Sequence, residues 1–287
     1  MIKTSRQLKA LVRNLTKSDS AQAQIIIRNY VMERFLERIS LSKYRNNFIL
    51  KGGMLVSAMV GIDTRSTMDM DTTIKNLPLT IDTAREIIEE IISIPIDDGM
   101  SFTIKNIYEI MDEAEYSGVR ANLEATLETM RTPLKIDIST GDVITPKEIS
   151  YSFKLMFEDR TISILAYNLE TVLAEKMETV ISRGTVNTRL RDYYDLFILQ
   201  NEYIHVIDIE QFCKALLATG IKRDSVKLME DGQQILQEIR ESEEMQTLWK
   251  NYQKKFVYAE DVAWDSVMQA ITSLFGQYRN KMDRSVY

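Results

Sequence analysis

The chain has 287 residues, enough to bury one large hydrophobic core or two moderate ones. Hydrophobic residues make up 45% and charged residues 27%, a balance typical of folded globular proteins that argues against a disordered chain. The net charge of −6 argues against a surface that is positive throughout, although a local basic groove is still compatible with it.

Histidine and cysteine each occur once, as His205 and Cys213. A single cysteine cannot form an intrachain disulfide and fits a reducing compartment, so a cytoplasmic location is expected. One histidine excludes a multi-histidine zinc site, so catalysis is expected to rest on carboxylates, lysines and arginines, with or without a bound metal ion. No apolar run reaches membrane-spanning length, and no signal peptide is expected.

The elements are predicted from the spacing of apolar residues. The first 45 residues have helical spacing, a strand is expected at "NFIL", a helix begins near Gly52, and a strand covers "MDMDTTI". A helix is predicted over residues 81–92. Alternating segments follow at "SFTIKNIYEIM", "GVRANLEATLE" and "PLKIDIST", with one more short strand at "DRTISILA". These strands follow one another without helices, which predicts an antiparallel arrangement for the later part of the sheet.

From residue 168 onward, helical periodicity extends to the end of the chain. The sequence therefore predicts an α+β fold, with a mixed sheet and flanking helices in residues 1–167 and a helical domain in residues 168–287. We expect the helical domain to complete the active site.

Two aspartates, Asp69 and Asp71, lie within the predicted strand "MDMDTTI". Side chains alternate between the faces of a strand, so both carboxylates are expected on one face, about 6–7 Å apart. Carboxylates this close repel each other unless a cation lies between them. Asp137 in "LKIDIST" is expected on the polar face of its own strand. Three such carboxylates predict a site for two Mg²⁺ ions.

Gly52 and Gly53 fall between a predicted strand and a predicted helix, in a chain with only 10 glycines. At such a junction, backbone N–H groups and the helix N-terminus can bind a phosphate without an intervening side chain. Lys51 and Arg65 flank this path. Each motif alone is weak, because an Asp-x-Asp is most often a solvated strand edge or loop. The ordered set of glycine pair, Asp-x-Asp and later aspartate is far more specific.

This ordered set resembles the signature of the nucleotidyltransferase superfamily, which includes polymerase β and the aminoglycoside nucleotidyltransferases. The resemblance is carried by Gly52, Gly53, Asp69, Asp71 and Asp137. It implies a nucleotidyltransferase-like sheet within the predicted α+β fold.

A second cluster lies in the helical part of the chain. Lys176 falls within an apolar stripe of its predicted helix, where an ammonium group needs an anion or a route to water. Asp192 and Asp195 lie three residues apart on one face of the next predicted helix, with Arg189 and Arg191 beside them. A salt-bridge network between the two helices would explain any one of these residues equally well.

Together with the glycines and aspartates, the second cluster looks like the AbiEii/AbiGii toxin family. The resemblance is carried by "LKGG", "DMD", "LKIDIS" and the block from Lys176 to Asp195. It implies a bacterial toxin of an abortive-infection, type IV toxin–antitoxin pair that defends against phage and arrests growth by nucleotidyl transfer. Related toxins add nucleotides to the 3′ end of tRNA, and GTP binding is known in the family. The resemblance therefore implies GTP or a pyrimidine nucleotide as substrate, and an antitoxin that acts without a stable complex.

The predicted site residues fall into four groups. Counterparts of Asp69, Asp71, Lys176 and Asp195 are needed for toxicity in the family that the chain resembles. The catalytic group is Asp69, Asp71, Asp137, Lys176, Asp192 and Asp195, of which Asp69, Asp71 and Asp137 form the metal group. The nucleotide-binding group is Lys51, Gly52, Gly53, Thr67 and Lys176, and the RNA-binding group is Arg183, Arg189 and Arg191.

The leading hypothesis is a Mg²⁺-dependent transfer of a nucleotide to RNA by a monomeric enzyme. A second hypothesis keeps the same chemistry but directs it to the hydroxyl of a small molecule or a protein side chain, which the acidic pI of about 5.2 mildly favours. A third is a nucleotide-binding regulator without turnover. The presence of all three aspartates and Lys176 argues against this third hypothesis, because a site that only binds has little need of a carboxylate that activates a hydroxyl.

Overall fold

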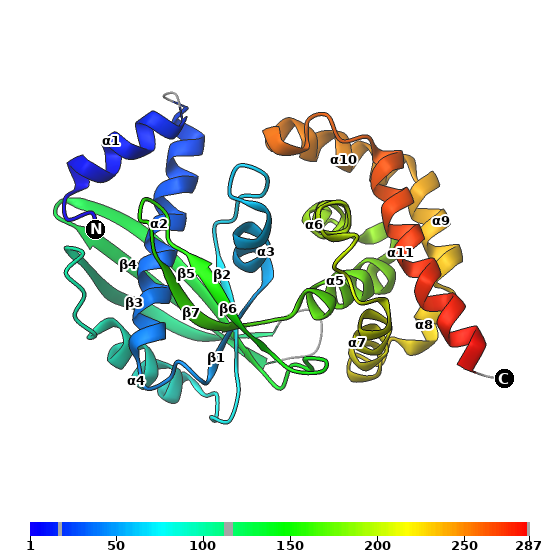
Figure 1. Cartoon of the computed structure of the whole chain (residues 1–287), viewed down its shortest axis with the longest axis horizontal. Helices are drawn as coiled ribbons and strands as arrows, with labels where there is room; N and C mark the ends of the chain where they lie inside the picture. The colour runs from blue at the N-terminus through cyan, green and yellow to red at the C-terminus, as the bar shows by residue number, and fades with distance from the viewer. Residues whose placement is uncertain (17–18, 112–116, 286–287) are drawn as a thin grey trace. The chain divides into compact units, whose positions relative to one another are not determined.

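The structure is a computed structural model that describes residues 1–16, 19–111 and 117–285 (Figure 1). It divides into two compact units. The first unit comprises Met1–Asp142 and Glu148–Tyr167, and the second comprises Val143–Lys147 and Asn168–Tyr287. The predicted fold class is confirmed: the first unit has a mixed sheet with flanking helices, and the second is helical.

A seven-stranded mixed sheet forms the centre of the first unit, in the order β3-β4-β5-β2-β1-β7-β6. β4 runs antiparallel to both β3 and β5, as predicted. β2 runs antiparallel to β1 and parallel to β5, and β1 runs parallel to β7. The strand bounds are β1 Phe48–Lys51, β2 Met70–Ile74, β3 Met100–Met111, β4 Ser117–Leu127, β5 Met130–Thr140, β6 Ile149–Lys154 and β7 Thr161–Ala166.

Two details of the sheet differ from the prediction. The strand predicted over residues 68–74 begins only at Met70, so Asp69 lies in the bend just before β2, and the prediction that it lies within the strand is wrong. The pairing of β2 with β5 starts at Met70, which leaves Asp69 outside the ladder. β6 was not predicted, because it is an edge strand whose side chains are mostly exposed and whose apolar alternation is therefore weak.

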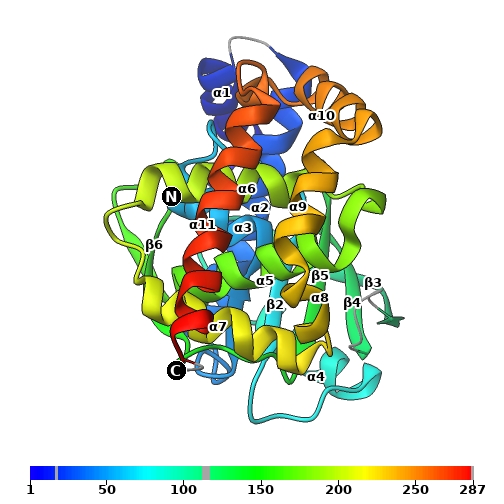
Figure 2. The same ribbon diagram turned by 90° about the vertical axis from the view of Figure 1, so that its right-hand side faces the viewer.

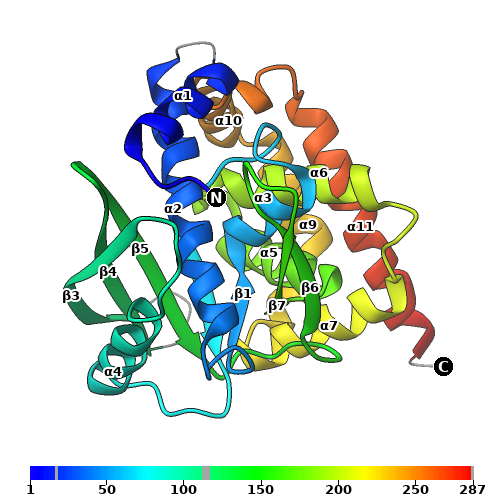
Figure 3. The ribbon, with the colours of Figure 1, turned by 60° about the vertical axis from the view of Figure 1, so that its left-hand side comes forward.

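Four helices accompany the sheet in the described part of the first unit. They are α1 Ser5–Thr16, α2 Ser20–Leu41, α3 Gly52–Val60 and α4 Ile81–Ile92. Figure 3 shows α2 running across the sheet, where it contacts β5 and β7, and α4 beside β3. α3 contacts β1 and β2, the two strands that its own segment connects. The N-terminus of α3 therefore lies where β1 ends.

The second unit is built from helices, of which α11 runs alongside α9 in Figure 2. The Asn168 side chain caps α5 by accepting a hydrogen bond from the Thr171 N–H, and donates to the backbone carbonyls of Thr145 and Lys147. These bonds explain why Val143–Lys147 groups with this unit. The helices are α5 Leu169–Arg183, α6 Leu190–Tyr203, α7 Ile209–Lys222, α8 Val226–Glu230, α9 Gly232–Glu241, α10 Glu243–Lys255 and α11 Trp264–Ser285, with short 3-10 turns η1 Gly184–Val186 and η2 Val257–Ala259.

Among the described residues, no helix is both long and apolar enough to cross a bilayer.

Candidate active site

The strand register aligns four charged residues across four neighbouring strands of the first unit. Asp71 on β2 lies opposite Asp137 on β5. Arg120 on β4 lies on the far side of Asp137, and Lys51 on β1 lies on the far side of Asp71. Residues in register on neighbouring strands project to the same face of a sheet. The row therefore holds two adjacent carboxylates with a cation at each end.

Asp71 is half-buried, and its surroundings disfavour the ionised form of its carboxyl group. Burial raises the pKa of Asp71, and the negative charges of Asp137 and Asp69 raise it further. Lys51 and a hydrogen bond from the Gly53 backbone N–H act in the opposite direction but do not cancel the increase. Such repulsion between neighbouring carboxylates is the condition that a bound divalent cation would relieve.

Two basic side chains neutralise the other aspartates. Arg120 grips Asp137 with two parallel hydrogen bonds, from Nε to Oδ1 at 2.6 Å and from Nη2 to Oδ2 at 2.8 Å. These bonds raise the pKa of Arg120 above its ordinary value. The Lys135 ammonium lies 2.9 Å from Asp69 Oδ2 and 3.9 Å from Asp137 Oδ2. Neither residue was predicted from the sequence. Arg120 lies beside Asp137 only through the strand register, whereas Lys135 is two residues before Asp137 on β5, so the alternation of that strand places both on one face.

The glycine pair allows the Asp71 carboxylate of β2 to lie against the N-terminus of α3. Gly52 has a φ of +64°, and a Cβ built on it would lie 2.2 Å from Asp71 Oδ2. Only glycine allows both this backbone conformation and this close approach. The Gly53 N–H binds the Asp71 carboxylate, and the positive end of the helix dipole favours that carboxylate's charge. The glycines thus position a carboxylate here, and their predicted contact with a phosphate stays a prediction.

Lys51 belongs to a buried hydrogen-bonded group on the same sheet. Its ammonium lies 2.5 Å from Asp142 Oδ2. The Tyr167 hydroxyl and the Ser139 hydroxyl donate to the same oxygen, at 2.6 Å and 2.9 Å. Burial raises the pKa of Asp142, but Lys51 and these hydrogen bonds outweigh it and hold the pKa below its ordinary value. Asp142 was also missed in the sequence, where nothing distinguishes it from a surface aspartate.

Thr67 fixes the turn that carries Asp69. Its side chain is buried, and its hydroxyl donates to the Asp69 backbone carbonyl at 3.3 Å. Asn29 Nδ2 donates to the Thr67 carbonyl at 2.8 Å. A Cβ built at Gly53 would lie 2.8 Å from Thr67 Oγ1, so this turn packs closely on the glycine pair. The structure therefore gives Thr67 a positioning role, and its predicted contact with the nucleotide stays a prediction.

The residues of this row fit a divalent cation in their chemistry. Carboxylate oxygens are the ligands that Mg²⁺ prefers, and the register brings Asp71 and Asp137 together. Among the described residues, however, no three acidic, histidine or cysteine side chains already stand together as a metal site. In this structure Arg120 and Lys135 neutralise the charges of Asp137 and Asp69. When a metal ion binds, it would replace these two cations as the partner of the aspartates.

The second unit brings Lys176, Asp192 and Asp195 together. The Lys176 ammonium on α5 lies 3.0 Å from Asp192 Oδ1 and 2.6 Å from Asp195 Oδ2, both on α6. Arg189 Nε pairs with the other Asp192 oxygen at 2.9 Å. Lys176 is 9% exposed and Asp195 is 0% exposed, so this network is buried. The alternative prediction of a salt bridge between the two helices is confirmed, and a catalytic role for these residues stays a prediction.

The three predicted RNA-binding arginines also lie in the second unit. Arg183 is half-exposed at the end of α5. Arg189 is tied to Asp192, but its side chain keeps 48% of its surface exposed. Arg191 lies over the ring of Phe256, with its guanidinium carbon 5.3 Å from the ring centre. An approach of these arginines to Asp137 stays a prediction.

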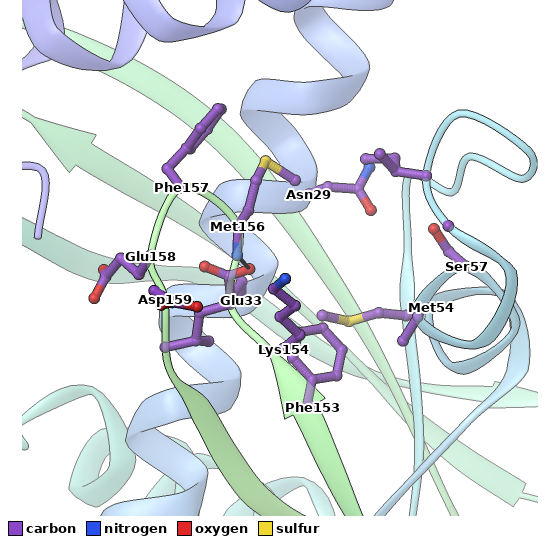
Figure 4. A pocket seen from close by; sticks show the side chains of 14 residues that line it. Asn29, Glu33, Met54, Ser57, Phe153, Lys154, Met156, Phe157, Glu158 and Asp159 are labelled. Carbon is purple, nitrogen blue, oxygen red and sulfur yellow. Dashed lines mark hydrogen bonds between the residues drawn. The ribbon is translucent and has the colours of Figure 1, made fainter.

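A cavity of about 640 Å³ lies elsewhere in the first unit, and none of the predicted site residues lines it (Figure 4). Glu33 of α2 points into it and accepts a hydrogen bond from the Met156 backbone N–H. Burial raises the pKa of Glu33 to about 7, although Arg34 and this hydrogen bond lower it. Arg34 is itself held by Glu33 and Glu158, so the acidic groups of the wall are largely committed to internal ion pairs.

Comparisons with solved structures show proteins of similar fold. Two crystal structures from Helicobacter pylori have a similar fold, both with a TM-score of 0.52. JHP933 is 13% identical over 92% of this chain and 95% of its own. A candidate nucleotidyltransferase is 12% identical over 91% of this chain and 97% of its own. The sequence matches no curated protein.

A family model settles the classification. The model described as "Nucleotidyl transferase AbiEii toxin, Type IV TA system" matches residues 34–270, which include both charged clusters. The chain therefore belongs to the AbiEii family of nucleotidyltransferase toxins of type IV toxin–antitoxin systems.

Proposed function

We propose that this nucleotidyltransferase transfers a nucleotide from an NTP to an RNA acceptor, the 3′ end of tRNA, and thereby arrests growth. The observation that carries the proposal is the register of Asp71 and Asp137 on adjacent parallel strands. It gathers negative charge where a phosphoryl-transfer enzyme needs metal ligands, next to the N-terminus of α3.

Asp69, Asp71 and Asp137 would hold two Mg²⁺ ions. Bound there, the ions would supply positive charge to the triphosphate and the attacking oxygen. The acceptor hydroxyl oxygen would form a bond to the α-phosphorus while the bond to the β-phosphate oxygen breaks, releasing pyrophosphate. Asp137 would accept the hydroxyl proton, and Arg120 would give up one of its two hydrogen bonds to free that oxygen.

Lys176 would contact the triphosphate and offset the charge that builds up on the leaving pyrophosphate. Two buried carboxylates, Asp192 and Asp195, restrict its ammonium group to one place. Arg183, Arg189 and Arg191 would contact the phosphates of the RNA, giving an acidic protein a local attraction for a polyanion. GTP or a pyrimidine nucleotide would be the donor, and the protein would act in the cytoplasm as a monomer under the control of an antitoxin that it does not bind stably.

One gel tests this proposal. The purified chain is incubated with Mg²⁺, total RNA and each α-labelled NTP in turn. We expect label in RNA, and we expect Asp71→Asn to abolish it. RNA transfer should also fall steeply between about 50 and 200 mM salt, because phosphate contacts release counterions. Label in protein or in a small molecule, with little salt dependence, would instead favour the other acceptors, and nucleotide binding without any transfer would favour a regulator.

A further inference from the structure

We infer that Phe256 and Tyr258, at the end of α10, form a stacking surface for unpaired bases of the RNA acceptor. We call these two side chains the aromatic edge. The inference rests on the proposed function, since it adds two aromatic side chains to the RNA contact proposed for Arg191, which lies over the Phe256 ring.

The aromatic edge is the exposed margin of a larger aromatic cluster in the second unit. Trp249 and Tyr252 are buried, and their rings stack at 5.3 Å, which is the behaviour of a structural core. Phe256 and Tyr258 continue this cluster but are only half-buried. Val257 between them is 80% exposed. The margin of the cluster therefore presents apolar ring surface to solvent.

The two rings of the aromatic edge are held in a fixed arrangement. Their centres lie 5.4 Å apart with an interplanar angle of 27°. The hydroxyls of Tyr258 and Tyr252 are 3.0 Å apart and hydrogen-bonded, and the Tyr194 hydroxyl donates to the Tyr258 carbonyl at 3.4 Å. The Phe256 N–H closes the last turn of α10 on the Tyr252 carbonyl. A surface held this way loses little conformational entropy when a base stacks on it.

Positive charge surrounds the aromatic edge. Arg191 and Lys255 both lie over the Phe256 ring, at 5.3 Å and 5.6 Å from its centre. Lys250 and Lys254 of the same helix are exposed, and no acidic residue occurs between positions 250 and 258. Glu260 and Asp261 follow in the next turn and limit the basic surface on that side.

Aromatic rings interleaved with arginine and lysine are the recurring means of binding single-stranded nucleic acid. The rings stack on bases, while the cations contact the phosphates between them. Here a base would replace Arg191 or Lys255 over the Phe256 ring, and the displaced cation would contact a phosphate. An acidic peptide would use the cations but not the ring faces, and a paired helix hides its bases from stacking. The chemistry therefore favours an unpaired RNA segment, such as a single-stranded end.

The test is binding of a labelled single-stranded oligoribonucleotide at two salt concentrations, about 50 and 200 mM. Phe256→Leu should weaken binding about 5-fold to 100-fold, because a stacked base is lost while the apolar volume is largely kept. The loss should be similar at both salt concentrations, and Phe256→Tyr should retain affinity. Lys255→Glu should weaken binding mainly at low salt and flatten the salt dependence. A paired hairpin without single-stranded ends should bind weakly to every form.

Two variants of the second unit serve as matched controls. Tyr203→Leu removes another half-exposed aromatic ring, and Lys227→Glu reverses another exposed charge. Both should bind the oligoribonucleotide like the wild type. Wild-type affinity in folded Phe256→Leu, or wild-type protein that binds no RNA, would overturn the inference. If the wild type transfers nucleotides to RNA while Phe256→Leu binds normally, only this inference fails. If the aromatic edge binds RNA but no transfer occurs, only the proposed function fails.

Discussion

Asp71 and Asp137 face each other directly across two parallel strands, and their repulsion is part of what raises the pKa of Asp71. Like charges opposite one another weaken a sheet. The protein keeps this arrangement at the centre of its sheet, with Lys51 and Arg120 at the two ends of the row. An unfavourable charge pair in the ligand-free protein is expected where function requires the charges.

Asp71→Asn should therefore stabilise the ligand-free protein at neutral pH while lowering transfer by at least about 100-fold. The folded-state pKa of Asp71 is raised, so its ionisation costs stability as the pH rises above the pKa of the unfolded state. Below about pH 3 the carboxyl is neutral in both states, and the advantage of the variant should disappear. Thermal unfolding of both proteins across this pH range measures the difference, and a variant that is less stable at pH 7 would contradict the account.

Gly52→Ala should destabilise the protein and abolish transfer. Its Cβ would collide with Asp71 Oδ2, and its φ of +64° is unfavourable for alanine. Gly61→Ala is the matched control, because Gly61 also has a positive φ, +93°, but a Cβ there meets nothing within 4 Å. The free energy of unfolding of the control should fall by only about 1–3 kcal/mol, because alanine is strained at this positive φ. Urea unfolding compares the two, and equal losses would mean that the contact with Asp71 is unimportant.

Lys135→Met should tighten the binding of Mn²⁺ or Mg²⁺, because the ammonium of Lys135 pairs with Asp69 and competes with an ion. A partly exposed ion pair contributes about 0.2–1 kcal/mol, so a gain of up to about fivefold is expected. Calorimetric titration of the metal measures it without any need for turnover. Lys105→Met, which breaks an exposed pair with Glu124 on the same sheet, should leave metal affinity unchanged. Weaker metal binding in Lys135→Met would contradict the prediction.

Lys176→Met should cost about 3–5 kcal/mol of stability, because it leaves the buried carboxylates of Asp192 and Asp195 without their partner. Adding Asp195→Asn to this variant should restore part of the loss. Lys214→Met breaks an exposed pair with Glu210 and should leave stability almost unchanged. Chemical unfolding measures all four proteins, and a stable Lys176→Met would mean that the buried network contributes little. If Lys176 also contacts the triphosphate, the Lys176→Met variant should bind nucleotide more weakly as well.

The sequence allowed much of this site to be predicted, and the limits have a physical origin. The bounds of α4 and the alternation of β5 follow from local periodicity, so they were predicted correctly. Arg120 and Asp142 act through strand register and loop geometry, which no single segment encodes. Lys135 could have been found, because it shares a face of β5 with Asp137. Asp69 was placed in the strand because alternation continues through it, but the ladder that defines the strand starts one residue later. The aromatic edge depends on which rings of one cluster stay exposed.

The central claim is that the row of carboxylates around Asp71 transfers a nucleotide to RNA. Mass spectrometry of a tRNA pool tests it most directly, after incubation with Mg²⁺, each NTP, and either wild-type protein or Asp71→Asn. We predict that the wild type adds the mass of one or more nucleoside monophosphates at the RNA 3′ end with release of pyrophosphate, and that the folded variant adds none. Unchanged tRNA with the wild type, or equal addition by both proteins, would contradict the account.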